Sequence, residues 1–210
     1  MSPKVTEEHK EQRKREIVEA AKRVFKRKGF AQATMHDIVE ESGMSRGGVY
    51  MYFSSKEEIF DAILEQNDAE LFAGIREMVD RHETMWGVVE EFIEMAEHEL
   101  PNVTHDIGPV VYEVLMGSWR DEEKRALAKQ RYQQTVDMYV SILQHGVESG
   151  EFRPILPIED IAKSTLSFID GLTLHILHLG RESINLRGQL TALKAYLRHA
   201  LQVQGGGDGM

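Results

Sequence analysis

Apolar residues recur at helical spacing along almost the whole of this 210-residue chain. The first stripe consists of Ile17, Ala20, Ala21, Val24 and Phe25, and Gly29 follows it. Intervals of three and four residues place such side chains on one face of a helix, and glycine is a common residue just past a helix end. No segment alternates apolar and polar residues convincingly, as a half-buried strand does. The sequence therefore predicts an all-α protein of about nine helices.

Capping residues and helix breakers give the bounds of these helices. Thr34 and Asp37 form a capping-box pattern, and Gly43 can end the helix that they open. Ser45 is placed to cap the next helix, and a serine at 54 or 55 the long one after it. The predicted helices span residues 17–28, 35–42, 46–53, 55–81, 85–100, 106–120, 122–150, 158–180 and 186–203.

Composition excludes several classes of protein. The chain has no cysteine, which removes disulfide scaffolds, thiolate zinc sites and cysteine nucleophiles. No apolar run reaches the roughly 18 residues of a membrane helix, and the charged N-terminus has no signal-peptide core. We therefore expect a cytoplasmic protein with no membrane partner and no cofactor. The glycine-rich residues 204–210 are predicted to be a disordered tail.

Charge is distributed unevenly along the chain. Residues 10–56 contain 11 lysines and arginines against 6 acidic residues, although the whole chain has a net charge of -10. This asymmetry is typical of a small polyanion-binding unit attached to an acidic body. Alternatively, the basic residues Lys22, Arg23, Lys26, Arg27 and Lys28 form only the solvated face of one helix.

Residues 34–53 fit the helix-turn-helix plan, in which two short helices flank a turn that contains glycine. In this plan the second helix, residues 46–53, enters the major groove with its N-terminal residues foremost. Arg46 can then bind a guanine edge, Met51 can touch a thymine methyl group, and glycines allow close backbone approach. One of the two tyrosines should pack inside, because so short a helix cannot expose both faces. The candidate DNA-binding residues are Thr34, Ser45, Arg46, Gly47, Gly48, Tyr50, Met51, Tyr52 and Lys56.

Residues 17–64 closely resemble the DNA-binding domain of the TetR family of bacterial transcriptional regulators. The matching positions are Ala20-Ala21, Phe25, Lys28-Gly29-Phe30, Thr34, Ile38, Gly43, Ser45, Tyr50, Tyr52-Phe53 and Ser55-Lys56-Glu57. The resemblance implies a homodimer that binds a palindromic DNA operator, usually as a repressor released by a small-molecule inducer. It implies a DNA-binding domain at residues 10–56 and a helical ligand-binding and dimerisation domain at residues 57–203.

The second domain offers candidate residues for both of these roles. Large adaptable side chains that could line a ligand pocket are Trp86, Phe92, Met95, Tyr112, Met116, Trp119, Tyr132, Met138 and Tyr139. Small or regularly spaced residues that could form a dimer interface are Ser164, Ser167, Phe168, Gly171, Leu190, Leu193 and Leu197. The alternative is that both sets simply fill the core of one subunit. Carboxylates at 90, 91, 94, 97, 99 and 113 favour either a cationic ligand or a solvated helix face.

Rival functions find less support in the sequence. Residues 43–47 match the G-x-S-x-G pattern of hydrolases, but that motif needs a preceding strand and residues 37–42 are predicted to be helical. His175 and His178 lack the further ligands of a metal site. We therefore expect neither catalytic activity nor a metal. A helical protein-interaction module without a DNA role remains the alternative, and salt-dependent DNA affinity distinguishes it from a regulator.

Overall fold

A computed structural model of the protein describes residues 7–204. Within this range the chain forms nine α-helices and two short 3₁₀ helices, with no strand, which confirms the predicted all-α fold. No helix there is long and apolar enough to cross a membrane. Most of the predicted tail lies outside the described residues, and the amide of Gln204 donates to the carbonyl of Glu151 at 2.7 Å.

The described chain forms two compact units. The first contains residues up to 71 together with residues 105–117, and the second contains residues 72–104 and the chain from residue 118 onward. Helix α4 (Lys56–Arg81) therefore contributes residues to both units. This division differs from the predicted boundary at residues 56 and 57, since the first unit takes a helix from the middle of the chain.

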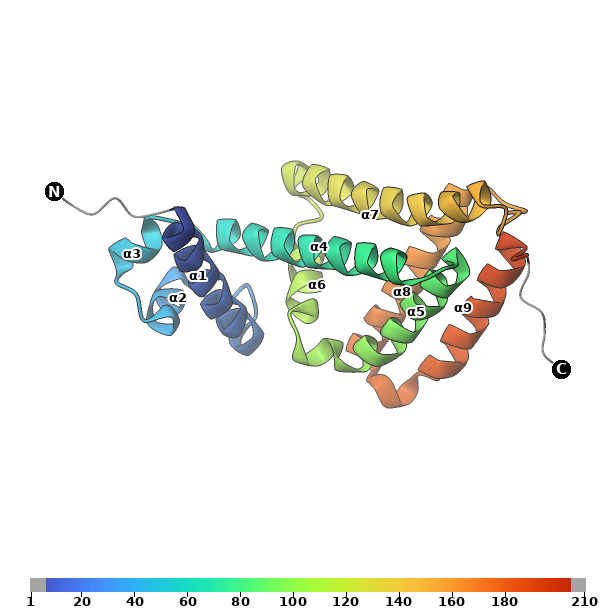
Figure 1. Ribbon diagram of the computed structural model, residues 1–210. Helices are drawn as coiled ribbons and strands as arrows, with labels where there is room; N and C mark the ends of the chain where they lie inside the picture. The colour runs from blue at the N-terminus through green and yellow to red at the C-terminus, as the bar shows by residue number, and fades with distance from the viewer. Residues whose placement is uncertain (1–6, 205–210) are drawn as a thin grey trace. The chain divides into compact units, whose positions relative to one another are not determined.

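The first unit is built from α1 (Glu7–Lys28), α2 (Met35–Ser42), α3 (Arg46–Tyr50), the first part of α4, and α6 (Gly108–Gly117) (Figure 1). The stripe predicted for α1 is buried in its core, where Val110 of α6 and Ile107 just before that helix join it. The rings of Phe25, Phe30 and Phe60 contact one another at centroid distances of 5.1–6.1 Å. Burial of such aromatic and aliphatic groups supplies most of the stability of a small helical unit.

Helix α3 is shorter than predicted. We expected it to reach Phe53, but it ends at Tyr50. The amides of Tyr52 and Phe53 both donate to the carbonyl of Val49, which makes a tight turn. The Phe53 side chain is then drawn into the core, where it is 6% exposed. Tertiary burial of one ring therefore ends the helix.

The second unit packs the end of α4 with α5 (Met85–Glu99), α7 (Glu122–Glu148), α8 (Ile158–Leu179) and α9 (Leu186–Leu201) (Figure 1). Short 3₁₀ helices lie at Leu100–His105 and Arg181–Ser183. Glu151 caps α5, because its carboxylate accepts from the amides of Met85 and Trp86 at 2.7 and 2.8 Å. The backbone of residues 153 and 155 donates to the last carbonyls of α9. These bonds fix the connection between α7 and α8.

Candidate nucleic-acid interface and ligand cavity

Helices α2 and α3 form a helix-turn-helix whose local geometry depends on its caps. The hydroxyl of Thr34 accepts from the amide of Asp37 at 3.2 Å, and the Asp37 carboxylate accepts from the Thr34 amide at 3.0 Å. Gly43 ends α2 at a φ of +67°, which favours glycine. The Ser45 hydroxyl accepts from the amide of Gly48 at 3.1 Å and so caps α3. Both predicted caps are confirmed.

Asp37 also binds a cation and a hydroxyl group next to this helix-turn-helix. The ammonium group of Lys28 lies 2.7 Å from its carboxylate, and the Thr34 hydroxyl donates to it at 2.9 Å. These hydrogen bonds from Lys28 and Thr34 lower the pKa of Asp37 to about 2. Since the Thr34 hydroxyl already donates to Asp37, its use as a donor to a DNA phosphate would require that bond to break.

Helix α3 exposes a compact surface suited to base recognition. Met51 is 77% exposed and Tyr50 is 42% exposed, and the guanidinium group of Arg46 lies over the Tyr50 ring, 5.3 Å from its centroid. A Cβ atom added at Gly47 would meet no atom within 4 Å, whereas one at Gly48 would lie 3.2 Å from the Ser45 hydroxyl oxygen. Gly47 therefore keeps the outer surface open, and Gly48 allows the capping bond of Ser45.

A hollow of about 160 Å³ lies between α2 and α3. It is lined by Met35, His36, Val39, Arg46 and Tyr50. His36 is a residue that sequence reasoning missed: its side chain is 80% exposed and its Nε2 lies 3.5 Å from a Glu40 carboxylate oxygen. Its sequence position could have indicated this role, because it lies within the capping box and on the side of α2 opposite the buried Ile38. A group entering this hollow would meet both Arg46 and an imidazole.

Tyr52 and Lys56 do not belong to the exposed α3 surface. Tyr52 is partly buried against the core of the first unit, so it is the tyrosine that packs. The ammonium group of Lys56 donates to the carbonyls of Phe30, Ala31 and Ala33 at 2.8, 3.3 and 2.9 Å. It also lies 4.6 Å from the centroid of the Phe30 ring. An ammonium has three N–H donors, so these three bonds occupy it inside the unit, although the sequence made Lys56 a candidate DNA-binding residue.

The turn between α1 and α2, whose carbonyls bind Lys56, is also bound by a residue of α6. The Glu113 carboxylate accepts from the amides of Phe30 and Ala31, both at 2.9 Å. The connection between α1 and α2 is therefore fixed by two side chains: the Glu113 carboxylate accepts from its N–H groups, and the Lys56 ammonium donates to its carbonyls. Glu113 is more than 80 residues away in the sequence, so no local pattern could have indicated this contact.

The basic run of α1 is neutralised by acidic partners. Its ion pairs are Lys22–Glu19, Arg23–Glu41, Lys26–Asp106, Arg27–Glu41 and Lys28–Asp37, with nitrogen–oxygen distances of 2.7–3.1 Å. Hydrogen bonds from Arg23 and Arg27 lower the pKa of Glu41. The run is therefore better described as a paired, solvated helix face than as a phosphate-binding surface.

The second unit contains an apolar cavity of about 30 Å³. Its lining residues are Ile75, Met78, Val88, Val89, Phe92, Tyr139, Ile142, Leu143, Ala162, Thr165 and Leu197. Of the residues predicted to line a ligand pocket, Phe92 and Tyr139 line this cavity. Trp86 is buried in the core, Met95 and Met138 lie outside the lining, and Tyr112 and Met116 belong to the first unit.

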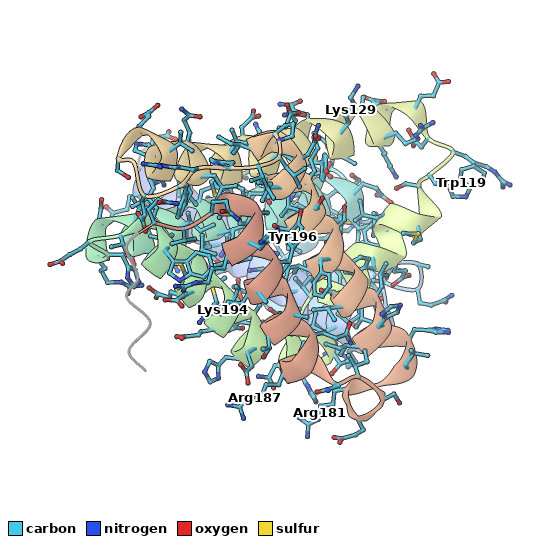
Figure 2. The ribbon with its side chains drawn as sticks, turned by 90° about the vertical axis from the view of Figure 1, so that its right-hand side faces the viewer. Trp119, Lys129, Arg181, Arg187, Lys194 and Tyr196 are labelled. Atoms are coloured by element: carbon cyan, nitrogen blue, oxygen red, sulfur yellow. The ribbon has the colours of Figure 1, made fainter. Side chains whose placement is uncertain are left out.

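Two further predicted pocket residues face solvent. Trp119 is 59% exposed, stands away from the ribbon, and has the guanidinium group of Arg120 over its ring (Figure 2). Tyr132 is 41% exposed. The error has a physical cause: residue type indicates which side chains can line a pocket, but only helix packing decides which of them face inward.

The predicted dimer residues fall into two groups. Leu190, Leu193 and Leu197 are buried in the core of their own subunit, so that part of the predicted interface is wrong. Ser164 and Ser167 are exposed, and a Cβ atom at Gly171 would meet nothing within 4 Å. Phe168 is partly buried against the core. On α9 the exposed residues Ala192, Ala195 and Tyr196 are available instead.

A capped helix-turn-helix with an exposed Arg–Gly–Tyr–Met surface, in a chain that also has a helical unit with an apolar cavity, defines a helix-turn-helix DNA-binding regulator. Comparison with known proteins agrees. Residues 17–63 match the family model of bacterial regulatory proteins of the tetR family, and residues 88–187 match the tetracyclin repressor-like C-terminal domain.

Whole-chain relatives extend this match. The chain is 43% identical over 204 residues to the uncharacterized HTH-type transcriptional regulator YfiR of Bacillus subtilis, covering 96% of this chain and 98% of that one. It is 30% identical over 151 residues to the HTH-type transcriptional repressor KstR2 of Mycobacterium tuberculosis, covering 70% and 72% of the two chains. The fold matches a TetR transcription regulator from Haloarcula marismortui, with a TM-score of 0.75, 22% identity, and coverage of 91% and 100%. The chain belongs to the TetR family of transcriptional regulators.

Proposed function

We propose that this regulator is a dimeric repressor that binds a palindromic operator and leaves it when a small-molecule inducer binds. The observation that supports operator binding is the exposed surface of α3, where Arg46, Tyr50 and Met51 lie beside the open Gly47. Arg46 leaves the Tyr50 ring to bind the O6 and N7 atoms of a guanine. Met51 touches a thymine methyl group, and the Ser45 hydroxyl binds a phosphate.

Dimerisation is assigned to the outer surfaces of α8 and α9. Ser164 and Ser167 present small side chains on α8, Gly171 leaves open space there, and Leu174 on the same helix is 38% exposed. Ala192, Ala195 and Tyr196 extend this surface onto α9. Small residues permit close approach of helices, so two such pairs from two subunits can form a four-helix interface.

Release from DNA is assigned to α4. This helix contributes residues 56–71 to the unit that binds DNA, and its later residues Ile75 and Met78 line the cavity of the second unit. A ligand in the cavity contacts these two side chains and so acts on the same continuous helix. The other walls of the cavity come from α5, α7, α8 and α9, and do not include Tyr112, Met116 or Trp119, which were candidate pocket residues.

Selection of bound duplexes from random DNA tests this function. We expect a palindromic sequence bound roughly 10³-fold or more tightly than a scrambled duplex, with an affinity that falls steeply with salt. A single half-site should bind much more weakly, because it engages one recognition helix of the dimer. Selection that yields no common sequence, with no salt-dependent affinity, would favour the protein-interaction module instead.

A further inference from the structure

Five helices of the second unit contribute side chains to the wall of its cavity. Ile75 and Met78 come from α4, Phe92 from α5, Tyr139 from α7, Ala162 from α8, and Leu197 from α9. Its volume of about 30 Å³ suffices for a water molecule or two and is far below the roughly 300–1,000 Å³ of an open drug-sized pocket. A larger ligand must therefore push side chains aside.

The side chains best placed to move are two aromatic rings. Phe92 and Tyr139 meet edge to face, with centroids 5.0 Å apart, and both residues are only partly buried. Met78 adds a flexible, unbranched wall. Rotation of either ring toward the surface enlarges the cavity without breaking a hydrogen bond that the described residues make there.

The chemistry of the lining is uniformly uncharged. None of the described residues that line the cavity carries an ionisable group other than the phenol of Tyr139, and burial raises the pKa of that phenol. The hydroxyl of Thr165 donates to the carbonyl of Ile161 at 2.8 Å, within its own helix. Placing an isolated ion in such surroundings costs several kcal/mol, because no charged side chain of the lining replaces its hydration.

Three of the acidic residues of α5 do not compensate for this. Glu90 pairs with Lys194 at 2.7 Å, Glu91 with Arg81 and His82 at 2.5 and 2.6 Å, and Glu97 with Arg187 at 3.5 Å. These carboxylates are already engaged by cations of the same unit. The cationic ligand that the acidic bias of the sequence suggested therefore has no unpaired carboxylate among these three to meet.

We propose that this cavity binds a neutral, predominantly hydrocarbon ligand with at most a hydroxyl-like polar end, and that charged ligands of equal chain length are excluded. The proposal rests on the proposed function only in treating this ligand as the inducer. Binding is driven by transfer of apolar surface from water into the cavity, with the Phe92 and Tyr139 rings closing over the ligand.

Calorimetry with three matched probes at pH 7 tests the proposal: hexan-1-ol, hexanoate and hexylammonium, with butan-1-ol and octan-1-ol to vary the length. Wild-type protein should bind at least one alcohol at least tenfold more tightly than either ion. Ala162→Val, which places two methyl groups in the cavity wall, should weaken alcohol binding at least tenfold. The same change at the exposed Ala126 of α7 should leave it unchanged. Phe92→Ala should shift the preference toward the longer alcohol.

The outcomes separate the two proposals. Binding of an ion as tightly as its alcohol, binding of no alcohol, or equal alcohol affinity in wild type and Ala162→Val would overturn the ligand class. Alcohol binding that follows the expected pattern but leaves operator affinity unchanged would support the ligand class and overturn the release mechanism. If the unliganded wild-type protein binds no operator, the DNA role is refuted and the ligand class is not.

Discussion

Replacing Lys56 by methionine distinguishes a positioning lysine from a phosphate-binding lysine. Methionine keeps most of the apolar stem over the Phe30 ring but removes the ammonium that binds three carbonyls at 2.8–3.3 Å. Hydrogen bonds to charged groups contribute about 1.5–3 kcal/mol each, and water can replace those at the exposed part of the turn. We therefore expect Lys56→Met to reduce the stability of the first unit by about 2–4 kcal/mol.

DNA binding by the same variant should weaken about equally for all sequences, with an unchanged dependence on salt. A lysine that touches one phosphate in each half-site contributes about 1.8 to the slope of log K against log salt for a dimer. Fluorescence anisotropy at several salt concentrations measures this slope, and urea titration measures stability. Lys129→Met, on the exposed surface of α7, is the charge-matched control. A slope reduced by about two with unchanged stability would show that Lys56 binds phosphate and would refute the positioning role.

Four other changes give separate tests. Arg46→Ala should cost roughly 1–3 kcal/mol of operator binding and relax the preference at one base pair, as measured by competition with substituted operators; an unchanged preference would remove Arg46 from the readers. Gly171→Arg should yield folded monomers in analytical ultracentrifugation, because the new side chain has room in one subunit but not between two; an intact dimer would place the interface elsewhere. Asp37 has a folded pKa of about 2, below the unfolded value of about 3.9, so its contribution is present above pH 4 and is lost as the pH falls toward 2. Urea titrations should thus show the stability gap between wild type and Asp37→Asn narrowing over that interval, and a constant gap would contradict the assignment. Glu113→Gln leaves one acceptor oxygen for two amides, so hydrogen exchange at Phe30 or Ala31 should accelerate, and unchanged protection at both would refute the clamp.

Features set by neighbouring residues could be predicted from the sequence. The caps at Thr34 and Ser45 and the left-handed end at Gly43 depend on interactions within a few residues, and each is found where the pattern places it. The recognition surface follows from these caps, which is why Arg46 and Met51 could be placed before the packing was known.

Features set by tertiary contacts could not be predicted. The end of α3 depends on the burial of Phe53, and the inward face of α9 depends on the helices that cover Leu190 and its neighbours. The clamp of Glu113 on the turn after α1 joins residues more than 80 positions apart. Residue type alone likewise placed Trp119 in a pocket, although its ring is exposed. The errors concern where a predicted helix begins or ends, and which way its side chains point.

Methylation interference on the selected operator tests most directly whether α3 reads bases through Arg46. Methylation of guanine N7 blocks the bidentate contact of an arginine in the major groove. We predict that wild-type protein is excluded by methylation at one guanine in each half-site, with the two positions related by the symmetry of the palindrome. Arg46→Ala should bind methylated and unmethylated operators equally at those positions. Wild-type binding that is indifferent to methylation at every guanine would contradict base recognition by Arg46.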